Sequence, residues 1–393
     1  QLPIGGSGRV FGTTKMVCGG TAPANVLDPE AMAQAEAQKA INKSINKMIR
    51  SSRESAESKT KMLLLGAGES GKSTIFKQMQ IINGTGYTKD ELASFKWIIH
   101  RNVLDAIQIL ITQASSMGIQ LEEANEDRAE QVQLWEGENL NPELALAIEA
   151  LWADPGIQQT FDKRADFQLG DASKYFLDQV GRIAAADYVP IVDDVLRARV
   201  RTSGVVSKEF CIPATGTTQA RAIELFDVGG QRSERRRWIH FFDHVNSLVF
   251  VAAISEYNQV LAEDASKNRL EEAMDLFEQI VQSHHFSDTS VYLFLNKRDL
   301  FEEKIKTIDP RRWFPDYTGG CDKDKCEAFF RAKFKERMQR AKNKSALYVH
   351  TTCATDTGNI RFVLDGIFKD EFMDMGISAK QLEGLSFASP DHL

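Results

Sequence analysis

The sequence contains few cysteines. The five are Cys18, Cys211, Cys321, Cys326 and Cys353. An odd number scattered through 393 residues does not provide the paired framework of a small disulfide-rich secreted protein, and it favours a reducing compartment such as the cytosol. One pair is closely spaced, but no second pair and no nearby histidine cluster complete a tetrahedral zinc site. A disulfide scaffold and a structural zinc site are therefore both disfavoured.

Long apolar runs and an excess of basic charge are also missing. No stretch approaches the roughly 18 consecutive apolar residues that a membrane-spanning helix needs, and the first residues lack the apolar core of a secretory signal. With 48 Lys and Arg against 55 Asp and Glu, the net charge is -7. Proteins that neutralise nucleic-acid phosphates usually carry a basic domain or stripe. We therefore expect no nucleic-acid partner and only peripheral contact with membranes.

The first 57 residues divide into two segments. Residues 1–28 are rich in Gly, Thr and Pro without periodicity, which predicts a flexible leader. Residues 29–57 carry apolar side chains at helical spacing, which predicts an amphipathic helix. Seven Lys or Arg and two Glu lie between residues 39 and 61. The pattern leaves open whether this helix packs on its own domain or contacts a partner or a membrane.

Five short apolar runs further along the chain predict buried strands. Each run ends at a loop of polar or small residues, and helical patterns such as 270–281 and 326–340 stand between them. This alternation predicts an α/β fold with a mostly parallel sheet covered on both faces. Ligands of such sheets bind at the carboxyl ends of the strands. The five runs are 62–65, 222–226, 248–253, 291–295 and 346–349.

The stretch from residue 88 to residue 196 shows no convincing strand. Thr88 and Glu91 have the spacing of a capping box, and apolar residues then recur at near-helical intervals. Further helices are predicted at 143–152 and 172–184. The simplest interpretation is an all-helical domain inserted into a sheet domain. The predicted domains are 88–196 for the helical insertion, and 58–87 with 197–393 for the sheet domain.

A glycine-rich segment follows the first predicted strand and opens a predicted helix. It has two glycines flanking four residues and then Lys and Ser, which is the full phosphate-binding loop pattern. Such glycines let backbone N–H groups face the phosphates, Lys72 neutralises the outer phosphates, and Ser73 can ligate magnesium. The segment therefore predicts a site for a nucleoside phosphate with Mg²⁺. Its residues are Gly66, Ala67, Gly68, Glu69, Ser70, Gly71, Lys72 and Ser73.

The base is specified by a second motif, which follows the strand predicted at 291–295. Asp299 can accept hydrogen bonds from both the ring N–H and the amino group of guanine, an arrangement that adenine does not offer. Asn296 and Lys297 would brace the loop that carries Asp299. This motif predicts GTP or GDP as the ligand in preference to ATP.

A third motif, Asp227-Val228-Gly229-Gly230-Gln231, follows the strand predicted at 222–226. An Asp at this place can hold magnesium, usually through water, and Gly230 lets its backbone N–H approach the terminal phosphate. Gln231 then stands where it could orient an attacking water molecule. The motif predicts hydrolysis of the bound nucleotide.

Together with the segment 196–202, these three motifs closely resemble the alpha subunits of heterotrimeric G proteins. The resemblance extends over about residues 30 to 378 and includes the helical insertion, which small monomeric GTPases lack. It implies a Ras-like P-loop GTPase domain with a mostly parallel sheet and an inserted all-helical domain. It also implies a molecular switch that binds and hydrolyses GTP.

The resemblance further implies roles for single residues. Thr202 would join Ser73 on magnesium, with Asp227 acting through water. Arg199 would be a built-in arginine finger, for which alpha subunits are a standard example, and Glu69 would pair with it in the inactive state. A planar cation that cannot lose its proton suits the charge that spreads over a transferred phosphoryl group. The other residues implied around the nucleotide are Leu196, Arg197, Ala198, Val200, Arg201, Val228 and Gly229, with Asp171 and Ala172 from the helical domain and Cys353 and Ala354 at the guanine.

The sequence departs from the family pattern in a hairpin and at both ends. The segment 213–221 makes the hairpin before Asp227 longer than usual, and the chain runs about a dozen residues past the usual C-terminus. No Met-Gly start is present for myristoylation. Met16 is a candidate initiator, and Cys18 is then the candidate for lipidation.

Partners are implied by the same resemblance. The GDP form would bind a G-protein beta-gamma dimer through the 29–57 helix and the segment 228–240, and a seven-helix receptor would catalyse GDP release. An effector of unknown identity and a GTPase-activating regulator would bind the GTP form, at the cytoplasmic face of the plasma membrane. Two alternatives remain, a nucleotide-dependent scaffold without turnover and a P-loop ATPase or kinase. Arg199 and Gln231 argue against the scaffold, and Asp299 argues against ATP.

Overall fold

The computed structural model describes residues 59–137, 139–200, 202–212 and 221–374. The chain divides into two compact units, residues 1–57 and 58–393, and the first unit lies outside the described residues. The predictions for the leader, the amphipathic helix, Cys18 and Arg201 fall there or in a gap. The same is true of the C-terminal extension and of the hairpin segment 213–221 except for its last residue. They stay predictions.

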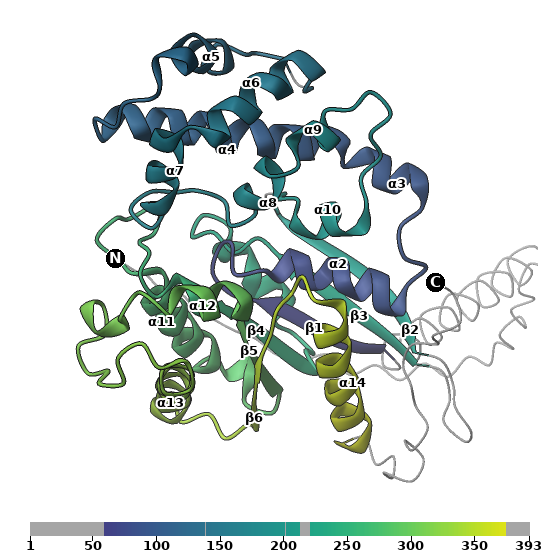
Figure 1. Cartoon of the computed structure of the whole chain (residues 1–393). Helices are drawn as coiled ribbons and strands as arrows, with labels where there is room; N and C mark the ends of the chain where they lie inside the picture. The colour runs from purple at the N-terminus through teal and green to yellow at the C-terminus, as the bar shows by residue number, and fades with distance from the viewer. Residues whose placement is uncertain (1–58, 138, 201, 213–220, 375–393) are drawn as a thin grey trace, which may run out of the picture. The chain divides into compact units, whose positions relative to one another are not determined.

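Six described strands form one sheet in the order β2-β3-β1-β4-β5-β6 (Figure 1). Neighbouring strands run parallel except β2 and β3, which confirms the mostly parallel sheet. The apolar runs do not predict β2, because it is an edge strand in which Lys208 and Glu209 interrupt the apolar residues. The strands are β1 (Lys59–Leu65), β2 (Val205–Ile212), β3 (Arg221–Val228), β4 (Ser247–Ala253), β5 (Ser290–Asn296) and β6 (Leu347–Thr351).

Helices cover both faces of the sheet. Side chains alternate between faces along a strand, and β1 shows this directly: Leu64 packs with α2 (Lys72–Asn83) and α14 (Thr357–Asp374), whereas Leu63 packs with α11 and α13. Every residue of β4 is buried, as expected for a strand with apolar neighbours on both sides. The remaining helices of this part are α11 (Arg269–Val281), α12 (Arg298–Lys304), α13 (Lys323–Arg340) and the short 3₁₀ turns η1 (Arg235–Phe241), η2 (Ile254–Glu256), η3 (His284–Phe286) and η4 (Pro310–Arg312).

Residues 88–196, here called the helical lobe, contain no strand among those described. The capping box is confirmed, because the Glu91 N–H donates to Thr88 Oγ1 at 3.2 Å and the Thr88 N–H donates to Glu91 Oε2 at 2.7 Å. The single helix predicted at 172–184 is wrong in detail, since it is two short helices. The helices are α3 (Lys89–Ser94), α4 (Lys96–Ser116), α5 (Glu123–Gln133), α6 (Pro142–Ala153), α7 (Pro155–Asp162), α8 (Ser173–Leu177), α9 (Val180–Ile183) and α10 (Val192–Arg197).

The helical lobe has a hydrophobic core of its own. Apolar residues of α4 such as Ile99, Val103 and Ile107 are fully buried at its centre. The two cores beside the sheet draw no residue from 88–196. We propose on this basis that the predicted domain boundaries hold. None of the helices in the described part of the chain combines the length and hydrophobicity needed to cross a bilayer.

Candidate nucleotide site

A cavity of about 550 Å³ lies where the loops after β1, β3, β5 and β6 meet the helical lobe. This is the carboxyl end of the parallel strands, where ligands of open α/β sheets bind. Six of the expected residues lie outside the cavity lining, namely Gly66, Ala67, Ser70, Asp227, Gly229 and Cys353. The expected residues that line it are Gly68, Glu69, Gly71, Lys72, Ser73, Asp171, Ala172, Leu196, Arg197, Ala198, Arg199, Val200, Thr202, Val228, Gly230, Gln231, Asn296, Lys297, Asp299 and Ala354.

The phosphate-binding loop has a backbone that only glycine allows at two positions. Gly66 has φ +146°, and a Cβ there would lie 2.2 Å from the carbonyl oxygen of Val251. Gly71 has φ +103° and caps α2, and a Cβ there would lie 2.2 Å from Nδ2 of Asn296. The loop can therefore pack against β4 and the guanine motif, which brings its N–H groups and the positive end of α2 to the cavity.

Lys72 is a buried cation that contacts no carboxylate of the described residues. Its Nζ donates to the carbonyl oxygens of Gly66 at 3.1 Å and Ala67 at 2.7 Å. Burial lowers the pKa of Lys72 to about 8, although the charge of Asp227 opposes the shift. A polyanion in the cavity would favour the charged ammonium group again. The site is therefore electrostatically prepared for phosphate.

Three oxygen-bearing side chains meet beside this lysine. Ser73 Oγ lies 2.7 Å from both Thr202 Oγ1 and Asp227 Oδ2. Asp227 Oδ1 is buried and has no hydrogen-bond partner among the residues that the structure describes, and burial raises the pKa of this carboxyl group. Magnesium prefers oxygen ligands at 2.0–2.1 Å in an octahedron, whose adjacent ligands lie about 2.9 Å apart. The cluster therefore fits Mg²⁺, with Ser73 and Thr202 as candidate ligands and Asp227 behind them.

Asn296 connects the loop after β5 to the phosphate-binding loop and to the loop after β6. Its Nδ2 donates to the carbonyl oxygen of Ser70 at 2.9 Å, and its Oδ1 accepts from the N–H of Ala354 at 3.0 Å and from Thr352 Oγ1 at 3.1 Å. Asp299 lines the cavity beside them. The loop that carries Asp299, the residue expected to bind guanine, is thus connected to the phosphate-binding loop.

Arg199 and Gln231 each contact a residue of the phosphate-binding loop. Arg199 Nη2 donates to Glu69 Oε1 at 2.6 Å, so the expected pair is present. Burial alone would raise the pKa of Glu69, but the guanidinium groups of Arg269 and Arg199 outweigh it and hold the pKa below its usual value. Gln231 packs on Gly68, where an added Cβ would lie 3.3 Å from its Cγ. Both side chains therefore border the place where the terminal phosphate would lie.

Comparison with known proteins agrees with this geometry. The family model of the G-protein alpha subunit matches residues 39–371. This chain belongs to that family. It is 42% identical over 325 residues to the guanine nucleotide-binding protein alpha-16 subunit of Caenorhabditis briggsae, covering 81% of this chain and 90% of the relative. It is 43% identical over 324 residues to the G-protein complex alpha subunit gpaA of Aspergillus fumigatus and to a guanine nucleotide-binding protein subunit alpha of Sporothrix schenckii, with the same coverage. The family assigns the chain the general role of a GTP-binding molecular switch in signal transduction.

Six alternating charges run through the site of this alpha subunit. Arg199 contacts Glu69. Arg269 follows, in contact with Glu69 at 3.2 Å and with Glu256 at 3.3 Å. Lys297 then contacts Glu256 at 2.6 Å and Asp171 of the helical lobe. Burial alone would lower the pKa of Lys297, but the carboxylates of Asp171 and Glu256 outweigh it and raise that pKa. Asp171 therefore acts here by binding Lys297 across the cavity, a contact that the motif spacing does not predict.

Residues of α2 hold two neighbouring segments in ways that the motifs do not reveal. Lys77 Nζ donates to the carbonyl oxygens of Val195 and Ala198, both at 2.8 Å, and burial lowers the pKa of Lys77 to about 8. Gln78 Nε2 donates to the carbonyl oxygen of Ala354 at 2.9 Å. Neither residue belongs to a motif, and both act on backbone carbonyls far along the chain.

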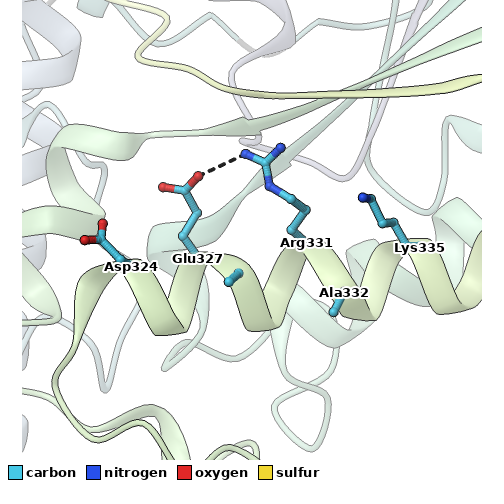
Figure 2. A pocket seen from close by; sticks show the side chains of 6 residues that line it. Asp324, Glu327, Arg331, Ala332 and Lys335 are labelled. Carbon is cyan, nitrogen blue, oxygen red and sulfur yellow. Dashed lines mark hydrogen bonds and ion pairs between the residues drawn. The ribbon is translucent and has the colours of Figure 1, made fainter.

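A second concavity, of about 300 Å³, lies on the surface of α13 and contains none of the expected residues. Figure 2 shows its charged side chains along one face of the helix, with Glu327 and Arg331 paired at 3.1 Å. Arg331 also donates to the carbonyl oxygen of Val349, on the edge strand β6. No residue of the phosphate, magnesium or guanine motifs lines this hollow, so it is not a candidate nucleotide site.

Trp238 of η1 should report the nucleotide state of this alpha subunit. It is 3% exposed, and its Nε1 donates to the carbonyl oxygen of Gly229 at 2.8 Å, next to the glycine expected to meet the terminal phosphate. We expect tryptophan emission to change when GDP is replaced by a non-hydrolysable GTP analogue, because η1 repacks around the phosphate. The change should persist in Trp97→Phe, which alters an exposed side chain of α4. If it also persists in Trp238→Phe, this segment is not the switch.

Proposed function

We propose that this alpha subunit binds GDP and GTP with Mg²⁺ and hydrolyses GTP to reset itself. The observation that supports the proposal most is the pairing, at one end of one cavity, of buried Lys72 with the oxygen cluster of Ser73, Thr202 and Asp227. Residues of the guanine motif line the same cavity, and Asn296 connects that motif to the phosphate-binding loop. The arrangement suits a guanine nucleotide with its phosphates on α2.

The phosphate end would bind the nucleotide before any reaction. Backbone N–H groups of residues 67–73 and Lys72 would contact the phosphate oxygens. Ser73 and Thr202 would hold magnesium, with Asp227 accepting from a water in its shell. When bound, Mg²⁺ bridges the outer phosphates and offsets their charge.

Hydrolysis would depend on Arg199 and Gln231. The Arg199 side chain is 55% exposed, and a surface ion pair of this kind contributes at most about 1 kcal/mol. Arg199 can therefore leave Glu69 at little cost and place its guanidinium on the phosphoryl oxygens, where charge develops. Gln231 would orient the attacking water, since its side chain packs on Gly68 of the phosphate-binding loop.

Each proposed partner would bind one nucleotide form of the alpha subunit. In the GDP form, the segment 228–240 and the 29–57 helix would bind a beta-gamma dimer, and a seven-helix receptor would promote GDP release. In the GTP form, η1 and the segment 199–206 would bind an effector and a GTPase-activating regulator. These partners, and peripheral attachment at the cytoplasmic face of the plasma membrane through Cys18, rest on the family and on the sequence.

A competition experiment tests the choice of base. The protein is loaded with a fluorescent GDP, which is then displaced by GTP, GDP or ATP in the presence of Mg²⁺. We expect ATP to compete at least about 1000-fold more weakly, because a site that hydrogen-bonds a specific edge rejects a ligand that leaves its polar groups unpaired. Equal competition by ATP would indicate a P-loop ATPase or kinase.

A further inference from the structure

A side chain of the helical lobe forms two hydrogen bonds with the backbone of Arg199, the proposed arginine finger. Asn102 of α4 accepts a hydrogen bond from the Arg199 N–H through Oδ1 at 2.7 Å and donates through Nδ2 to the Arg199 carbonyl oxygen at 3.3 Å. The backbone N–H can only donate, so it fixes which end of the amide faces it. Asn102 also lines the nucleotide cavity. No motif accounts for this pair, whose members are 97 residues apart.

The same peptide is held from the opposite side. Lys77 of α2 donates to the carbonyl oxygens of Val195 and Ala198, at the end of α10. Ala198 is 4% exposed and belongs to the core of the helical lobe. The backbone at Ala198 and Arg199 is therefore anchored by α2, by α4 and by apolar packing, while the Arg199 side chain is 55% exposed. A fixed backbone with a movable side chain is what an arginine finger needs.

We propose that Asn102 is a positioning residue for GTP hydrolysis. It sets the backbone from which the Arg199 guanidinium reaches the phosphoryl group, so the helical lobe contributes to transition-state geometry and not only to nucleotide retention. A long side chain magnifies a small rotation of its backbone, and a misplacement of 1 Å can cost about 100-fold in rate. The inference rests on the proposed GTPase function, with Arg199 in the role given above.

The test compares Asn102→Ala with a matched control on the same helix. Gln108→Ala removes another hydrogen bond from α4, donated at 2.9 Å to the carbonyl oxygen of Val132 inside the helical lobe, and it does not touch Arg199. GTP is bound first, and one turnover is then started with Mg²⁺. We expect Asn102→Ala to hydrolyse bound GTP about tenfold more slowly, by displacing the finger. GTP affinity should stay within about twofold, and Gln108→Ala should match the parent.

A double-mutant cycle separates positioning of Arg199 from other effects. In the Arg199→Cys background, adding Asn102→Ala should cause no further loss, because there is no finger left to position. A persisting tenfold loss would show that Asn102 acts on Thr202 or on the nucleotide, and a parental rate in Asn102→Ala alone would also overturn the inference.

If Asn102→Ala binds too little GTP for the assay, the same comparison is made with Asn102→Asp, which keeps the acceptor for the Arg199 N–H and should lose less than tenfold. A parent protein that leaves bound GTP intact would instead remove the proposed function, and this inference with it.

Discussion

Arg199→Cys should slow hydrolysis of bound GTP by at least about 100-fold, a lower bound because an arginine finger can be worth about 1000-fold or more. The structure supports this because Arg199 lines the cavity with the phosphate-binding loop, and its side chain, 55% exposed, is held there by one ion pair with Glu69. A loss of 100-fold corresponds to about 2.7 kcal/mol of transition-state stabilisation. GTP binding should survive, since an interaction made only in the transition state does not alter ground-state affinity.

Gln231→Leu is expected to give the same phenotype by a different route. The leucine keeps the approximate volume beside Gly68 but cannot orient a water molecule. Hydrolysis is read after GTP has been pre-bound, so that slow binding cannot be mistaken for slow chemistry. A parental rate in Gln231→Leu would remove the water-positioning role, and weakened GTP binding in Arg199→Cys would mean that Arg199 already holds the ground state.

Asp299→Asn should weaken GTP and GDP binding by about 100-fold or more. Asp299 lines the cavity next to Asn296, which fixes its loop to Ser70 and Ala354. The asparagine replaces one acceptor by a donor, which then faces a donor of guanine, and loss of charge-assisted hydrogen bonds of this kind costs about 3 kcal/mol in total. The measurement is equilibrium displacement of a fluorescent GDP.

Xanthosine triphosphate provides the control for Asp299→Asn. Xanthine carries a carbonyl acceptor where guanine carries an amino donor, so an asparagine restores the match of donors and acceptors. The variant should therefore bind xanthosine triphosphate more tightly than the parent does. If both proteins bind GTP equally well, Asp299 does not read the base, and if the variant loses all nucleotides alike, its effect is structural.

Much of the sheet could be predicted because its strands are buried on both faces. The runs in β1, β4 and β5 are continuously apolar, so their places follow from the sequence. The runs in β1 and β5 also end at motif loops, which predicts the position of the site. The edge strand β2 lacks that signal, because half of its surroundings are solvent and it carries Lys208 and Glu209. The break between α8 and α9 was also not predicted. There, Asp178 accepts from Trp152 Nε1, a tertiary contact that a helical pattern does not show.

The candidate site divides in the same way. Residues of the phosphate-binding loop and of the guanine motif are local patterns, since their geometry depends on neighbours in sequence such as Gly66 and Gly71. Asn102 and Glu256 act through partners that lie far along the chain. Asn102 of the helical lobe binds the backbone of Arg199, and Glu256 after β4 binds Lys297 after β5. Neither residue stands in a sequence motif, so the sequence alone does not distinguish them from ordinary surface residues. Only the folded arrangement brings them to the site.

Turnover of GTP by this alpha subunit can be measured in a single cycle. The full chain is loaded with radiolabelled GTP without magnesium, Mg²⁺ is added together with excess unlabelled GTP, and phosphate release is followed over time. We expect one exponential release of phosphate at about 0.01 per second, the rate usual for alpha subunits with an arginine finger in cis. GTP that stays bound and intact for hours would instead show that the protein is a nucleotide-dependent scaffold and would contradict the proposed GTPase function.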